Sequence, residues 1–190
     1  MRILMASVMG VESQHLATLR AVGALLEGGA PQLIAIPTDV AALPAAAGSL
    51  EAVPPAVAEF ATTVEGLHQA ALDAWNGVLT ASGQSAVTSP PAALEATVNG
   101  MFATVTDVIG AAELALRLEQ ITAATYLDAI GKLESDAAIA LAGSIQPIDR
   151  QHIAVLLFVL GMYPVPETFA TVDMAFDGGV MMPDAMPATS

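Results

Sequence analysis

Four stretches of the chain carry apolar residues at helical spacing. Within residues 2–28, the spacing alternates between three and four residues and places one set on a single helix face: Met5, Val8, Glu12, His15, Leu19, Val22 and Leu26. Comparable stripes occur in residues 56–82, about 104–131 and about 135–162. The pattern predicts an all-α protein whose helices pack as a bundle.

Glycine and proline mark the expected ends of these helices. Residues 29–55 are rich in alanine and proline and predict a long crossover. Pro147 lies inside the last stripe, so we expect a kink or break there. Residues 1–165 are therefore assigned to one helical domain, and residues 166–190 to an irregular tail.

Carboxylates and histidines occupy stripe positions where apolar residues are expected. They are Glu12, His15, Glu119, Asp149 and His152. A carboxylate three residues before a histidine places both on adjacent turns of one helix face, within reach of one metal ion. Burying an unpaired charge is costly, so Glu119 needs a partner. These five residues are the candidate metal ligands.

Two carboxylate–histidine pairs among these candidates, Glu12 with His15 and Asp149 with His152, lie within an internal repeat. SVMGVESQHLATL (residues 7–19) aligns with SIQPIDRQHIAVL (residues 144–156), which puts Glu12 opposite Asp149 and His15 opposite His152. A repeat at this large separation suggests duplication of a two-helix unit.

Charge and composition exclude several classes of function. The net charge of −14, with five basic residues, disfavours nucleic acid and anionic membranes as partners. The absence of cysteine excludes thiolate catalysis and cysteine-ligated metal sites. Mean hydropathy is high, at +0.64, but the most apolar run, residues 153–163, is shorter than the roughly 20 residues of a membrane span. The first residues lack the layout of a signal peptide.

The stretches LEQITAATYLDAIGKL and AAIALAGSIQPIDRQHIAVL resemble the second half of a ferritin-like domain of the bacterial ferritin-like and desiccation-related family. Glu119 and Tyr126 match its Leu-Glu helix, and Asp149 and His152 match its Glu-x-x-His helix. Residues 1–28 resemble a helix of its first half. The resemblance implies an antiparallel bundle with a long crossover and a core site for two iron or manganese ions. Members of this family are often exported.

The chain also departs from the family pattern. Asp149 stands in place of a glutamate and is one methylene shorter. The family's first helix is expected upstream of Met1, as a truncated chain would show. Residues 56–82 then form an extra helix, which we expect either to be peripheral or to take the vacant place. Its His68 follows Glu65 by three residues, the spacing of the other two pairs. This pair either binds metal or, as the interpretation we favour, has Glu65 stabilising the helix dipole and His68 half exposed.

Three hypotheses of function follow. The first is a ferritin-like protein with a dinuclear iron or manganese site that oxidises Fe(II) with dioxygen or peroxide. The second is a non-catalytic structural or stress-related helical protein that keeps the fold without metal. The third is a homo-oligomer that completes its bundle with a helix from another copy.

Overall fold

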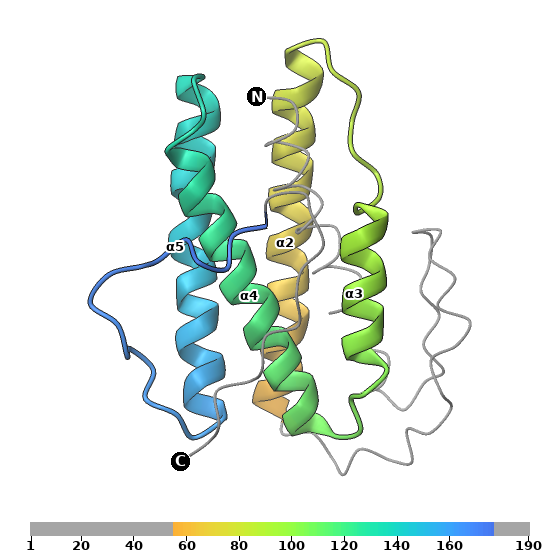
Figure 1. Ribbon diagram of the computed structural model, residues 1–190, viewed down its shortest axis with the longest axis vertical. Coiled ribbons are helices and arrows are strands. Elements are labelled where there is room, and N and C mark those ends of the chain that lie inside the picture. Colours follow the sequence, from red (N-terminus) through yellow and green to blue (C-terminus); the bar gives the residue numbers. More distant parts are fainter. Residues whose placement is uncertain (1–54, 177–190) are drawn as a thin grey trace.

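The computed structural model describes residues 55–176, so the predicted helix at 2–28 and nearly all of the crossover at 29–55 lie outside the described residues. The described part contains four helices and no strand: α2 (Pro55–Ala81), α3 (Ala92–Phe102), α4 (Val108–Ile130) and α5 (Asp136–Val159). Successive helices run in opposite directions (Figure 1). The prediction of an all-α antiparallel bundle is confirmed.

Polar caps begin two of these helices close to the predicted positions. The Asp107 carboxylate accepts a hydrogen bond of 2.8 Å from the Gly110 backbone N–H and caps α4. The Ser135 hydroxyl accepts a longer one of 3.5 Å from the Ala138 N–H at the start of α5. Each cap satisfies a backbone donor that has no partner within the first turn.

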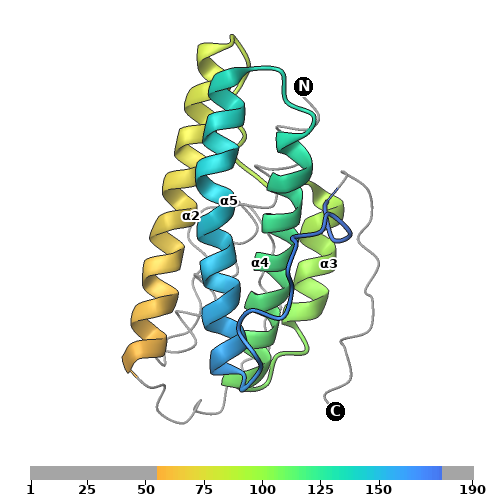
Figure 2. The ribbon, with the colours of Figure 1, turned by 90° about the vertical axis from the view of Figure 1, so that its left-hand side faces the viewer.

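Pro147 does not break α5, so the break, one of the two expected outcomes, does not occur. The helix continues from Asp136 to Val159 with the proline inside it. Proline removes one backbone hydrogen bond, but α5 packs more extensively against α4 than any other described helix pair does. This packing keeps both halves of α5 in one helix (Figure 2).

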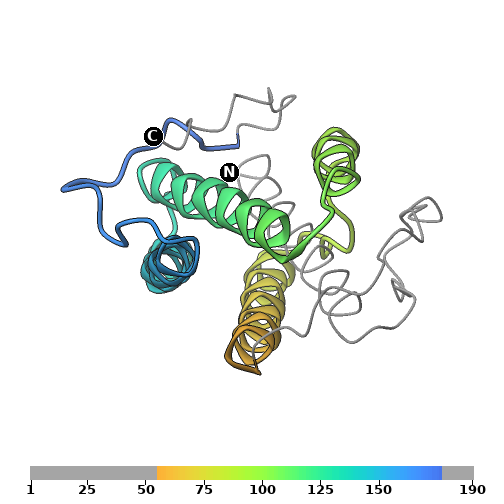
Figure 3. The same ribbon diagram turned by 90° about the horizontal axis from the view of Figure 1, so that it is seen from below.

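Helix α4 is the central element of the described fold. Seen along the bundle, it has α5 on one side, α3 on another and α2 across from it (Figure 3). Nearly every residue in its middle is therefore buried, including the small Ala123, Ala124 and Ala129. One apolar cluster joins α4 to α5, and another joins it to α3.

Residues 160–176 form no helix and run back along the bundle beside α5 and α4 (Figure 2). Gly161 adopts φ of 74°, a left-handed conformation that suits glycine, directly after α5 ends. Phe176 is buried against α3 and α4, and its backbone N–H donates to the Thr125 hydroxyl at 2.9 Å. Val159, at the end of α5, and Tyr163, just after it, are 49% and 74% exposed.

A stacked aromatic pair links α2 to α4 near one end of the bundle. The Trp75 indole N–H donates to the Tyr126 hydroxyl at 2.9 Å, and the two rings are 6.2 Å apart and nearly parallel. Both side chains are fully buried. The pair therefore combines aromatic packing with a satisfied hydrogen bond. None of the helices in residues 55–176 is long and apolar enough to cross a membrane.

We expect Asp107→Ala to lower the free energy of unfolding by about 1 kcal/mol, because it removes the acceptor that caps α4. Urea denaturation followed by circular dichroism measures the change. Thr106→Ala, at the adjacent exposed position, is the matched control and should stay within about 0.5 kcal/mol of the parent. Equal stability of the two variants would contradict a capping role.

We expect Tyr126→Phe to destabilise the protein by about 1–3 kcal/mol, because it leaves the buried Trp75 indole N–H without this acceptor. The same denaturation assay measures it. Trp75→Phe combined with Tyr126→Phe should cost less than the sum of the two single changes. Strict additivity would show that the hydrogen bond contributes nothing.

Candidate metal centre

Helix α2 carries His68 into the interior of the bundle. His68 lies four residues after Val64 and four before Leu72, so all three share the buried stripe of α2. Its side chain is only 2% exposed. The expectation that His68 is half exposed is therefore wrong.

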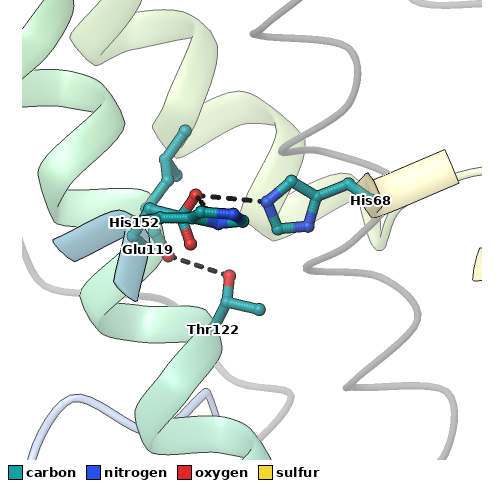
Figure 4. A network of polar contacts seen from close by, with 5 residues as sticks. His68, Glu119, Thr122 and His152 are labelled. Carbon is teal, nitrogen blue, oxygen red and sulfur yellow. Dashed lines mark hydrogen bonds and ion pairs between the residues drawn. The ribbon is translucent and has the colours of Figure 1, made fainter. Parts of the chain in front are cut away.

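Glu119 lies at the centre of a contact between three helices (Figure 4). Its Oε1 atom is 3.2 Å from His68 Nε2 of α2 and 3.0 Å from His152 Nδ1 of α5. An ionised carboxylate accepts hydrogen bonds, so each of these nitrogens donates to Glu119 in the histidine tautomer that carries its proton there. With 1% exposure, Glu119 is fully buried and does not extend toward solvent.

Helix α5 contributes two further polar groups from adjacent turns. Asp149 is 1% exposed and His152 is 6% exposed. The His152 ring also meets two rings edge-on, with centroids 5.8 Å from His68 and 5.9 Å from Phe60. These contacts hold the imidazole in place between α2 and α4.

The nearby Thr122 hydroxyl donates to the Leu118 backbone carbonyl at 2.8 Å, one turn back in α4 (Figure 4). This bond satisfies the hydroxyl within its own helix.

Four side chains thus converge from three helices: His68, Glu119, Asp149 and His152. Each offers one nitrogen or oxygen ligand atom, and these four atoms lie within 4.8 Å of one another. Two imidazoles and two carboxylates form a donor set that suits iron, manganese or zinc. The two carboxylates also bring negative charge into the protein interior, where a divalent cation would compensate it. The residues present therefore fit a metal ion.

The cluster contains three of the five ligands predicted from sequence, namely Glu119, Asp149 and His152. Glu12 and His15 lie outside the described residues, so their place stays a prediction. His68 was not among the predicted ligands. Its signal was the Glu65-x-x-His68 spacing shared with the other two pairs, yet Glu65 is only partly buried and is not in the cluster.

An apolar groove of about 240 Å³ leads to the cluster between α2 and α5. His68, Asp149 and His152 line it together with mostly apolar residues: Leu67, Ala70, Ala71, Ala74, Leu141, Ser144, Ile145 and Ile148. The buried donor set therefore has a route to the surface for small molecules.

Comparison with known proteins identifies the family of this fold. The family model of the ferritin-like domain matches residues 38–162, more than half of the chain. The match includes α2, which was expected to be an extra helix outside the family pattern. It does not include residues 1–28. Neither the curated proteins nor the solved structures contain a significant match. The antiparallel bundle and the family match together show that this chain belongs to the ferritin-like domain family.

Proposed function

We propose that His68, Glu119, Asp149 and His152 bind a divalent transition metal ion, iron or manganese, in the core of the bundle. The observation that carries this proposal is the convergence of the four ligand atoms within 4.8 Å. Mixed imidazole and carboxylate ligands suit these metals, whereas Mg²⁺ and Ca²⁺ prefer oxygen ligands alone. The absence of cysteine leaves these residue types as the strong metal ligands of the chain.

The chain's own groups would orient the site. The contacts of Glu119 Oε1 with His68 and His152 hold the two imidazole rings toward one point. The surrounding burial restricts water and strengthens electrostatic interactions at the site. A bound iron or manganese ion would supply redox chemistry with dioxygen or peroxide. Fe(II) oxidation is accordingly the activity we propose.

A dinuclear centre needs more ligands than these four residues supply. Dinuclear carboxylate sites in helical bundles take a carboxylate–histidine pair from each of two helices and single carboxylates from two others. Asp149 and His152 form one such pair, and Glu119 is one single carboxylate. Glu12 and His15, which have the same spacing in the sequence, are the proposed second pair.

One observation favours the alternative of a metal-free helical protein with a structural or stress-related role. Glu119 already receives hydrogen bonds from two buried histidines at 3.2 and 3.0 Å. A buried network of hydrogen-bonded polar groups can persist in a core without a metal and help to specify the packing. Metal analysis distinguishes the two functions.

We expect the purified chain, reconstituted with Fe(II) or Mn(II) without oxygen, to retain metal through desalting. Inductively coupled plasma mass spectrometry measures the metal per chain. His68→Ala and His152→Ala should each lose it, because each removes one of the four ligands. Asp73→Asn, an exposed carboxylate on α2, is the matched control and should bind as the parent does.

The number of metal ions bound per chain distinguishes a site for a single ion from a dinuclear centre. About two ions per chain, reduced by His15→Ala, would support the dinuclear centre. One ion that His15→Ala leaves unchanged would support a single ion held by the four described residues. Negligible metal in the parent chain would contradict the proposal and favour the metal-free alternative.

We also expect saturating Mn(II) to raise the melting temperature of the parent chain, because an ion that binds only the native state stabilises it. At 100 times the dissociation constant, the gain is about 2.7 kcal/mol. Differential scanning calorimetry, with His152→Ala as the control, measures the shift. Equal shifts in the parent and in His152→Ala would show that the ion binds elsewhere.

A further inference from the structure

A second cavity lies on the side of α5 away from the metal cluster. Its volume is about 520 Å³, within the range of small-molecule sites. Helices α4 and α5 form one wall, with Gln120, Gln146 and Arg150 as its polar groups, and the segment 162–174 forms the other. Figure 2 shows this segment running across the two helices.

Arg150 is the cationic group of this cavity. Its Nε atom is buried and has no hydrogen-bond partner among residues 55–176, where Arg150 forms no ion pair either. In a chain of net charge −14 with only five basic residues, this cation is placed where a small anion can reach it.

The remaining lining is mainly apolar. It consists of Ala124, Pro147, Ile153, Ala154, Leu157, Met162, Pro164, Val165, Pro166, Phe169, Ala170 and Met174, with Thr171 and Glu167 as the other polar residues. The flexible methionine side chains present a surface that adapts to flexible hydrocarbon. The cavity thus combines an apolar wall with one polar region.

We propose that this cavity binds a small amphipathic monocarboxylate, with its carboxylate on Arg150 and its apolar body along α5 and residues 162–174. A guanidinium matches a carboxylate with two parallel hydrogen bonds, and the Gln120 and Gln146 amides offer further donors. Glu167 also lines the cavity and disfavours a second negative charge on the ligand. A monoanion therefore fits better than a phosphate ester. The site is separate from the metal cluster and does not depend on metal binding.

The test uses decanoate as the probe and decanol as its uncharged analogue. Isothermal titration calorimetry is performed on the full chain after chelator treatment, so that no bound metal competes for the carboxylate. We expect decanoate to bind at least ten-fold more tightly than decanol, because hydrogen bonds to charged groups are the stronger ones.

Variants locate the site. Arg150→Gln should weaken decanoate about ten- to hundred-fold and leave decanol little changed, because it removes the charge alone. Lys132→Gln removes one positive charge at an exposed position that pairs with Asp128, and it should leave both affinities unchanged. Ala154→Trp should abolish binding of both probes by filling the cavity. Circular dichroism confirms that each variant is folded.

Four results would overturn the proposal, and the first three concern the affinities of the two probes. They are no binding of decanoate to the parent chain, equal affinity for decanoate and decanol, and equal loss in Arg150→Gln and Lys132→Gln. Full binding by a folded Ala154→Trp variant would place the ligand elsewhere and would also refute it.

Discussion

The burial of Glu119 is the constraint on which the described structure depends. A carboxylate at 1% exposure is tolerated only with partners that satisfy it, and two of them come from different helices, His68 on α2 and His152 on α5. Both bond to the same oxygen atom, so α2, α4 and α5 must keep one relative position. Seven residues farther along α2 and α4, Trp75 and Tyr126 repeat the connection with a second buried hydrogen bond.

The central place of α4 explains why so many of its residues are buried, small alanines among them. Ala123, Ala124 and Ala129 let neighbouring elements approach closely, and α3 and Phe176 cover the side that α5 leaves open. Helix α5 divides two environments. Asp149 and His152 belong to the four-residue cluster and line the groove toward α2, whereas Arg150, which lies between them in the sequence, lines the cavity beside residues 162–174. One helix thus separates a buried anionic site from a cationic one.

The chemical properties of the four-residue cluster depend on its burial as much as on the types of its side chains. Two carboxylates and two imidazoles on the surface would be hydrated and would hold a metal weakly, but burial removes the competing water. The same burial explains why the metal-free network is a serious alternative. Oxygen and nitrogen atoms that converge for a metal ion can also satisfy one another, as Glu119 Oε1 does with two histidines.

The sequence by itself determined the local features of this protein. The apolar spacing predicted α2, α4 and α5, and Glu119, Asp149 and His152 were expected on inward faces. Helical periodicity can be predicted in this way because it is a property of neighbouring residues. Only the tertiary structure decided that His68 lies in one cluster with Glu119, Asp149 and His152. It also decided that α5 continues through Pro147 and that Tyr163 is exposed. Periodicity shows which face of a helix is buried, but not which helix it meets, because that pairing depends on contacts between residues far apart in the chain.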